Sequence, residues 1–162
     1  LGMMAVGKTT LGKFVAKKQG LEFIDIDANI EVKCSMKISE IFKKKGEKFF
    51  RINEEKEVLN SLKKKNCVIA LGGGAFINKI IRNNVLENAI SIWLDVDLIT
   101  LNKRIKWNNN RPLLNKENNE KKISKLYSER KNIYNMANHK IVCNKLSKES
   151  IARKIIDLYE KH

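Results

Sequence analysis

The fold of this chain is decided by residues 2–9, which read GMMAVGKT. The pattern G-x-x-x-x-G-K-[ST] predicts a phosphate-binding loop, and its two glycines allow backbone N–H groups to turn inward around a phosphate. Lys8 can reach the β- and γ-phosphates of a nucleotide, and the Thr9 hydroxyl can ligate Mg²⁺. Residues 10–18 predict a helix whose positive end faces the phosphates. This stretch therefore predicts a site for a nucleoside triphosphate.

A phosphate-binding loop of this kind normally follows a buried strand, but only Leu1 precedes the loop here. We therefore expect the sequence to be incomplete at its N-terminus and to lack several residues of a central strand. The alternative is a true start at Leu1, which would leave a slot in the core of the protein.

Length and composition indicate one globular domain. The chain has 162 residues, of which 43% are hydrophobic, and no apolar run approaches the ~18 residues of a membrane span. Its three cysteines, Cys34, Cys67 and Cys143, are widely spaced and odd in number, which predicts reduced thiols of a cytoplasmic protein. Cys67 and Cys143 stand in apolar runs and are expected to be buried. We expect no zinc site.

The formal net charge of +15 makes nucleic-acid binding a rival function. Most of the excess is lysine scattered along the chain, and the runs at residues 43–45 and 63–65 are interpreted as solvated helix ends. A positive field would also attract an anionic small substrate.

Two acids follow each other closely in residues 21–27, which read LEFIDID. This stretch predicts a short strand, and its alternation would put Asp25 and Asp27 on the same face. Neighbouring carboxylates suit Mg²⁺ or a polyhydroxylated ligand. The alternative is a solvated strand end at which Asp27 caps the next helix.

Three consecutive glycines, Gly72-Gly73-Gly74, follow an apolar run at residues 66–71. The run predicts a buried parallel strand. Glycines in this number are entropically unfavourable, and they indicate close approach of the backbone to a ligand or N–H groups directed at an anion. The alternative is a flexible turn.

Helices and strands are expected to alternate along the rest of the chain. Helices are predicted over residues 28–33, 39–45, 47–62, 78–86, 98–105, 123–136 and 147–159, and strands over residues 89–94 and 140–143. Gly46 interrupts the second of these helices, and Asp97 is expected to cap the helix at 98–105. The alternation predicts an α/β doubly wound parallel sheet, with ligands beyond the carboxyl ends of the strands. Residues 107–122 are polar and predict a functional or disordered loop, in which Arg111 precedes the only proline.

Taken together, these motifs resemble those of the shikimate kinase family. They occur in that family's order and spacing: the loop at 2–9, FIDID at 23–27, GE at 46–47 with FR at 50–51, GGG at 72–74, RPLL at 111–114, and ER at 129–130 with Tyr134. The resemblance covers essentially the whole chain except its first strand. It implies a single domain over residues 1–162 and a three-layer α/β/α P-loop kinase fold. It also implies a central parallel sheet of about five strands and a mobile lid at about residues 107–122.

The resemblance implies ATP-dependent phosphorylation of the 3-hydroxyl of shikimate. The product, 3-phosphoshikimate, leads toward chorismate and the aromatic amino acids. Mg²⁺ is the implied cofactor, ATP is the co-substrate, and a cytoplasmic monomer that binds neither membrane nor nucleic acid is expected.

The family's site residues carry over position by position. The implied shikimate ligands are Asp27, Arg51, Gly72, Gly73, Gly74 and Arg130. The implied ATP ligands are Ala5, Val6, Gly7, Lys8, Thr9, Thr10, Arg104, which packs on adenine, and Arg111, which reaches the phosphates from the lid. Thr9 matches the Mg²⁺ ligand, and the catalytic residues are expected to be Lys8, Asp25 and Arg111. Asp25 either holds the metal through water or helps to deprotonate the attacking hydroxyl. Glu54 stands three residues after Arg51 and is expected to orient it.

The chain departs from the family pattern at several places, among them an unusually Asn-rich lid and the absent first strand. Ala5 stands where the family usually has glycine, and residues 146–148 lack the family's common arginine and proline. Three rival functions stay open: a related small-molecule kinase such as a gluconate kinase, a basic nucleic-acid-binding protein with a nucleotide switch, and an inactive homologue that serves as a binding module.

Overall fold

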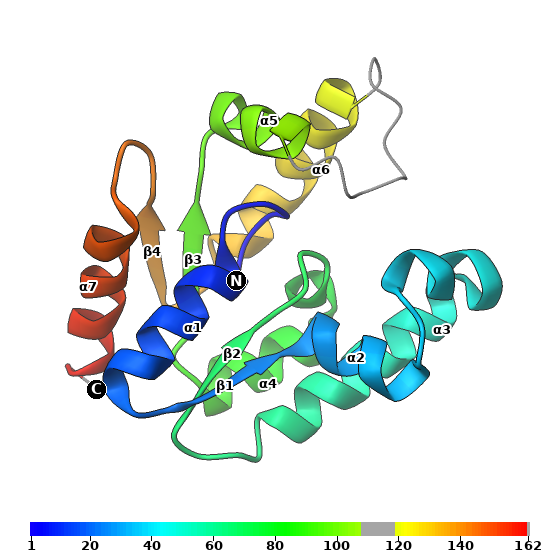
Figure 1. Ribbon diagram of the computed structural model, residues 1–162, viewed down its shortest axis with the longest axis horizontal. Helices are drawn as coiled ribbons and strands as arrows, with labels where there is room; N and C mark the ends of the chain where they lie inside the picture. Colours follow the sequence, from blue (N-terminus) through cyan, green and yellow to red (C-terminus); the bar gives the residue numbers. More distant parts are fainter. Residues whose placement is uncertain (108–118, 162) are drawn as a thin grey trace.

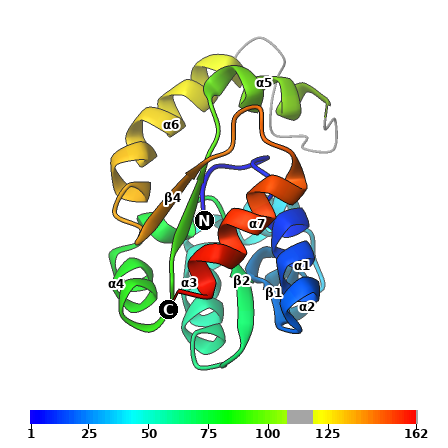
Figure 2. The ribbon, with the colours of Figure 1, turned by 90° about the vertical axis from the view of Figure 1, so that its left-hand side faces the viewer.

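The computed structural model describes residues 1–107 and 119–161. Short parallel strands lie between helices, and Figure 2 shows α4 on one side of the strands with α1 and α7 on the other. The elements are α1 (Lys8–Gln19), β1 (Glu22–Asp25), α2 (Ile26–Cys34), α3 (Ile38–Ser61), β2 (Cys67–Ala70), η1 (Ala75–Ile77), α4 (Lys79–Asn88), β3 (Ile92–Asp95), α5 (Leu98–Trp107), α6 (Asn119–Tyr134), β4 (His139–Val142) and α7 (Lys148–Tyr159). The predicted alternation of helices and strands is confirmed. None of the helices in this part of the chain is long and apolar enough to cross a membrane.

The strands form two parallel ladders (Figure 1). β1 pairs with β2 from Glu22↔Cys67 to Asp25↔Ala70, and β3 pairs with β4 from Ile92↔His139 to Asp95↔Val142. A groove separates β2 from β3, and the N-terminus lies between the ladders in both views. The phosphate-binding loop leads from this groove to α1.

The strand predicted over residues 21–27 ends earlier than expected. β1 stops at Asp25, and the chain turns at once into α2, whose first turn contains Asp27. Asp25 is the N-cap, because its Oδ1 accepts a hydrogen bond of 3.2 Å from Ala28 N. The predictions that the two acids share a strand face and that Asp27 caps the helix were therefore wrong.

Two other local predictions are confirmed. Gly46 interrupts α3 with a φ of 84°, a conformation that favours glycine. Asp97 caps α5, since its Oδ1 accepts a hydrogen bond of 2.7 Å from Thr100 N. Hydrogen bonds from Thr100 lower the pKa of the Asp97 carboxyl, so this acid has a structural role.

The core fills the space between the helices and the two ladders. Its largest fully buried side chains are Trp93, Tyr134, Phe76, Met3, Ile26, Ile30, Ile41, Ile81, Leu101 and Ile123. Cys143 is buried as predicted, but Cys67 is only half-buried. The prediction for Cys67, and for a fully buried β2, was wrong because this strand borders the groove.

Candidate active site

The loop at residues 2–7 depends on unusual backbone conformations. Gly2 has a φ of 137° and Gly7 a φ of 95°. A Cβ at Gly2 would lie 2.7 Å from the carbonyl oxygen of Leu94, so only glycine fits there. Ala5, the residue that departs from the family pattern, has a φ of 61°. A left-handed conformation is unfavourable for an L-residue by about 1–2 kcal/mol, so the methyl group is tolerated at the expense of stability.

Lys8 folds over the loop that precedes it. Its Nζ donates hydrogen bonds of 3.0 Å to Gly2 O and 2.8 Å to Met3 O. The ammonium group is thereby held against the loop at the start of α1, where the positive helix end lies. The side chain of Val6 is buried, so this residue offers its backbone to a ligand.

Thr9 and Asp25 come together from α1 and β1. The Thr9 hydroxyl donates a hydrogen bond of 2.7 Å to Asp25 Oδ2. A hydroxyl and a carboxylate are the hard oxygen donors that Mg²⁺ prefers, and Mg²⁺ completes its shell with water and phosphate oxygens. Among residues 1–107 and 119–161, no group of three or more His, Cys, Asp or Glu side chains is arranged so that it could hold a metal ion. The pair therefore fits a metal ion that is bound mainly together with a nucleotide.

Arg104 connects α5 to the loop, since its Nη1 donates a hydrogen bond of 3.2 Å to Val6 O. The structure thus brings this predicted ATP ligand to the phosphate-binding loop. Arg111 and most of the lid expected at about 107–122 lie outside the described residues.

The glycine turn at residues 72–74 is surrounded by charged side chains. A Cβ at Gly72 would lie 2.6 Å from Glu54 Oε1 and 2.7 Å from Asp27 Oδ1. A Cβ at Gly74 would lie 2.6 Å from Arg51 Nη1. The absence of side chains at this turn is therefore what allows the carboxylates and the guanidinium group to approach it.

Arg51 is held by two carboxylates of its own helix, α3. Its Nη1 donates to Glu54 Oε2 at 2.7 Å, and its Nη2 donates to Glu47 Oε1 at 3.1 Å. Glu54 is 1% exposed, and burial raises the pKa of its carboxyl although Arg51 opposes the shift. Glu54 Oε1 is buried without a hydrogen-bond partner among the described residues. Such a buried oxygen is expected to accept a hydrogen bond from water or from a bound ligand.

Arg130 and Tyr134 approach the same turn from α6. Arg130 Nη1 donates a hydrogen bond of 3.0 Å to Gly73 O, and the buried Tyr134 hydroxyl donates to the same oxygen. Arg51 and Arg130 therefore lie at neighbouring glycines of one turn. Two guanidinium groups at a turn suit a carboxylate ligand.

One supporting cluster was not predicted from the sequence. The hydroxyl of Tyr127, on α6, donates a hydrogen bond of 2.8 Å to Asp95 Oδ1, and Lys140 Nζ lies 2.9 Å from Asp95 Oδ2. Burial and the carboxylate raise the pKa of Tyr127 to about 12. This contact fixes α6, which carries Arg130, to the carboxyl end of β3. No sequence signal pairs the two residues, because they are separated by 32 positions.

Comparison with known proteins identifies the family. The family model for shikimate kinase matches residues 4–160. The chain is 43% identical to a shikimate kinase of Bartonella henselae over 156 residues, which are 96% of this chain and 74% of that protein. It is 40% identical to a shikimate kinase of Bacillus subtilis over 159 residues, 97% of this chain and 85% of that protein.

A solved structure gives the same result. The chain is similar to a shikimate kinase from Acinetobacter baumannii in complex with shikimate, with a TM-score of 0.92 and 34% sequence identity, covering 99% of this chain and 90% of that chain. The predicted three-layer α/β/α P-loop kinase fold is confirmed. The chain belongs to the shikimate kinase family.

Proposed function

We propose that the chain transfers the γ-phosphoryl group of ATP to the 3-hydroxyl of shikimate, giving 3-phosphoshikimate and ADP. The observation that carries this proposal is the position of the glycine turn between the phosphate-binding loop and two arginines. A Cβ at Gly73 would lie 3.4 Å from Met4 N of the loop and 3.7 Å from Arg130 Nη1. A carboxylic acid bound by Arg51 and Arg130 would therefore lie next to the phosphate-binding loop.

The acceptor pocket is proposed to form around the glycine turn. Arg51 and Arg130 bind the carboxylate through charge-assisted hydrogen bonds, which planar guanidinium groups can make in pairs. Asp27 accepts hydrogen bonds from ring hydroxyls, and the backbone of residues 72–74 completes the pocket. The buried Glu54 holds Arg51 in place through its hydrogen bond of 2.7 Å.

ATP is proposed to bind on the other side of the turn. Residues 5–10 surround its phosphates through backbone N–H groups and the Lys8 ammonium group. Arg104, which already reaches Val6 O, packs on the adenine. Arg111 is proposed to reach the phosphates from the lid and to add positive charge there.

Thr9 and Asp25 are proposed to hold Mg²⁺. When bound, this ion neutralises negative charge on the β- and γ-phosphates. Both oxygens of Asp25 are already engaged, Oδ2 by the Thr9 hydroxyl and Oδ1 by Ala28 N. This geometry favours the role in metal binding over that of a base for the attacking hydroxyl.

The reaction needs alignment and charge neutralisation more than covalent participation of the protein. A bond forms between the 3-oxygen of shikimate and the γ-phosphorus. The bond from that phosphorus to the β,γ-bridging oxygen breaks, its electron pair leaves with ADP, and the proton of the 3-hydroxyl passes to water. Lys8 and Arg111 stabilise the charge on the γ-phosphate oxygens, while the arginines at the turn orient the acceptor.

A substrate comparison tests the proposal. ADP release should depend on shikimate, and ³¹P NMR should show a phosphate ester at the 3-hydroxyl. Gluconate and nucleoside monophosphates are assayed in the same way as alternative phosphoryl acceptors. A kcat/KM for gluconate comparable to that for shikimate would contradict the assignment. So would ADP release that does not depend on shikimate.

We further propose that residues 1–162 form one catalytic domain that works as a cytoplasmic monomer and binds no nucleic acid. All three cysteines are free thiols, which supports a reducing compartment. Light scattering tests the monomer. Salt-dependent binding to random oligonucleotides would contradict the statement about nucleic acid.

A further inference from the structure

Helices α2 and α3 lie side by side and both reach the glycine turn (Figure 1). α2 carries Asp27 in its first turn, and α3 carries Arg51 and Glu54. Asp27 Oδ1 and Glu54 Oε1 lie 2.7 and 2.6 Å from one point, the Cβ position of Gly72. The proposed acceptor pocket therefore depends on two separate helices that must keep a fixed position relative to each other.

The two carboxylates at Gly72 repel each other. Burial is the main cause of the raised pKa of the Glu54 carboxyl, and the negative charge of Asp27 adds to it. Arg51 offsets this repulsion through its hydrogen bond to Glu54 Oε2, but both residues belong to α3. An ion pair within one helix does not fix the position of another helix. Contacts between α2 and α3 are therefore needed to keep Asp27 beside Glu54.

One such contact lies at the start of α3. Glu31 Oε1, on α2, accepts a hydrogen bond of 3.0 Å from the backbone nitrogen of Ile38, the first residue of α3. Gly46 then interrupts α3 with a φ of 84° before the helix reaches Arg51. Such a kink breaks the regular hydrogen bonds of a helix. The contact at Glu31 therefore does not by itself fix the part of α3 that carries Arg51.

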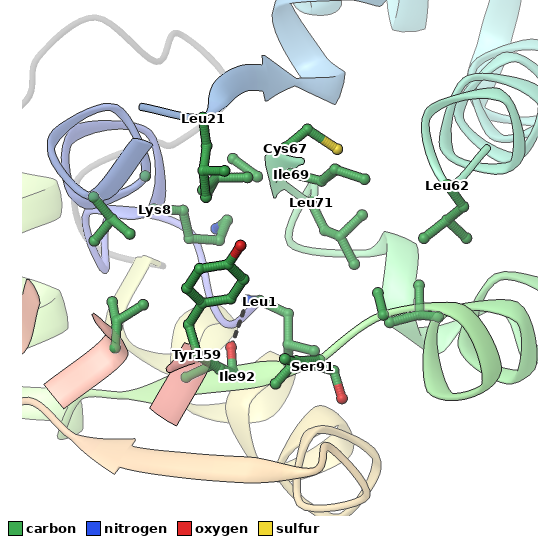
Figure 3. A pocket seen from close by; sticks show the side chains of 18 of the residues that line it. Leu1, Lys8, Leu21, Leu62, Cys67, Ile69, Leu71, Ser91, Ile92 and Tyr159 are labelled. Carbon is green, nitrogen blue, oxygen red and sulfur yellow. Dashed lines mark hydrogen bonds between the residues drawn. The ribbon is translucent and has the colours of Figure 1, made fainter. Parts of the chain in front are cut away.

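Glu57 provides a contact to α2 beyond this interruption. Its Oε1 accepts a hydrogen bond of 2.8 Å from Asn29 Nδ2, and its Oε2 is paired with Lys33 Nζ. Burial raises the pKa of the Glu57 carboxyl, but the hydrogen bonds from Lys33 and Asn29 outweigh this effect and lower the pKa, so the group is ionised at neutral pH. The cluster is separate from the groove between β2 and β3, which is lined near the end of α3 by Leu62 (Figure 3).

We propose that Glu57, Asn29 and Lys33 form a clasp that positions Asp27 of α2 against Glu54 of α3. They are positioning residues, because they act through the acceptor ligands, and the inference rests on the proposed function. Asn29 and Lys33 are one turn apart on α2, and Glu57 follows Glu54 by about one turn of α3. A displacement at the clasp is therefore passed to Asp27 and Glu54 over a short and rigid distance.

Loss of the ion pair tests this role. Glu57→Gln keeps an acceptor for Asn29 but removes the charge, and Lys33→Met removes the ammonium group but keeps an apolar stem. Each should raise the KM for shikimate by about 3- to 10-fold, because a displacement smaller than the ~1 Å that can reduce rates 10²-fold already weakens acceptor binding. The KM for ATP should stay within about twofold. Lys33→Arg keeps a cation and should keep both KM values within about twofold.

Glu31→Gln is the matched control. It also keeps a hydrogen-bond acceptor, here for Ile38 N, and removes a charge that pairs with a lysine, here Lys37. Its contact lies before Gly46, so the KM for shikimate should stay within about twofold. All assays are run well below the lowest Tm of the set, so that every variant is folded. Equal rises of this KM in the Glu31 and Glu57 variants would overturn the positioning role.

A double variant tests whether the clasp acts as one unit. Lys33→Met combined with Glu57→Gln should raise the KM for shikimate no more than the larger of the two single substitutions, because residues in one contact are not additive. Multiplication of the two single effects would mean that the residues act separately and would overturn the clasp.

Amide hydrogen exchange without substrates makes the test independent of the acceptor. Glu57→Gln and Lys33→Met should each speed exchange several-fold in residues 26–34 and 51–57, while α7 is unaffected. Phosphorylation of a different carboxylic acid in place of shikimate would contradict the proposed function, but faster exchange and a selective rise in the KM for that acid would still support the clasp. Unchanged exchange in both variants would overturn the clasp even if the chain phosphorylates shikimate.

Discussion

The phosphate-binding loop and the glycine turn both rely on glycine, but for different physical reasons. In the loop, Gly7 has a φ of 95° and the nearest atom to its Cβ position is Leu11 Cδ1 at 3.9 Å, so the constraint at this glycine is on the backbone. In the turn, Gly74 has a φ of −102°, which any residue adopts, and the constraint is the Arg51 guanidinium 2.6 Å from the Cβ position. A side chain at a positive φ raises the energy of the backbone conformation but leaves its neighbours in place. A Cβ in the turn would instead displace the charged groups around it. Under the proposed function, the loop binds the nucleotide and the turn binds the acceptor, so substitutions in the two regions should affect different substrates.

The largest effect is expected in the loop. Lys8→Ala should lower kcat by more than about 10³-fold, because the charge that stabilises the γ-phosphate oxygens is lost. Shikimate binding, measured by calorimetry, should stay within about twofold, since the acceptor pocket is intact. Lys17→Ala, an exposed lysine of the same helix, serves as the control. Substantial kinase activity in the Lys8 variant would refute the nucleotide assignment.

Gly72→Ala should have the next largest effect. Its Cβ would meet Glu54 Oε1 and Asp27 Oδ1 at 2.6 and 2.7 Å, so both carboxylates must move. We expect kcat/KM for shikimate to fall by about 10²-fold or more, as misplacement of ~1 Å can do, with little change in the KM for ATP.

The matched control is Gly20→Ala. Gly20 has a φ of 65° and no atom within 4 Å of its Cβ position. This variant should lose about 1 kcal/mol of stability through backbone strain and keep its kinetic constants. Equal kinetic losses in the Gly20 and Gly72 variants would contradict a specific effect of the Cβ at the glycine turn.

Arg51→Lys keeps the charge at the turn but removes the planar fork. We expect kcat/KM for shikimate to fall by about 10- to 100-fold while the KM for ATP changes little, because one or two directed hydrogen bonds are lost. Steady-state kinetics with each substrate varied will show this. Arg153→Lys on the exposed face of α7 is the control. Parallel losses for both substrates would argue against a role in acceptor binding.

Tyr127→Phe tests the anchor of α6. The variant should be less stable by about 1 kcal/mol at pH 7, because the hydrogen bond to Asp95 is lost. The pKa of Tyr127 is raised to about 12, so its contribution is complete below pH 10 and disappears as the pH rises toward 12. Urea unfolding of both proteins between pH 7 and pH 12 measures this difference. Tyr159→Phe, at a tyrosine that is 40% exposed, serves as the control, and a difference that stays constant above pH 10 would contradict the assignment.

The smallest effect is expected for Ala5→Gly. The substitution relieves the left-handed strain of ~1–2 kcal/mol but adds ~0.5–1 kcal/mol of chain entropy. The net result should be a gain of up to about 1.5 kcal/mol in urea unfolding, with kcat/KM for ATP within about threefold. Ala152→Gly, in the interior of α7, should instead lose about 1 kcal/mol. A loss of the same size in both variants would mean that Ala5 is unstrained.

Many local features of this structure can be predicted from short stretches of the sequence. The loop at 2–9, the interruption at Gly46 and the cap at Asp97 are predictable, because each depends on a few adjacent residues. The family resemblance extends this to Asp27, Arg51 and Arg130, whose roles at the site stay a prediction. Local reasoning was wrong where two local signals competed: the alternation of residues 21–27 favoured a longer strand, but Asp25 starts α2 as its N-cap.

Only the tertiary structure decided how the distant parts meet. The burial of Glu54, the joint approach of Arg130 and Tyr134 to Gly73 O, and the contact between Tyr127 and Asp95 each join separate elements. The half-burial of Cys67 is also a tertiary effect, because the exposure of β2 depends on the groove beside this strand. Sequence periodicity reports which side of an element is apolar. It does not report what packs against that side, since this depends on where the chain brings the other elements.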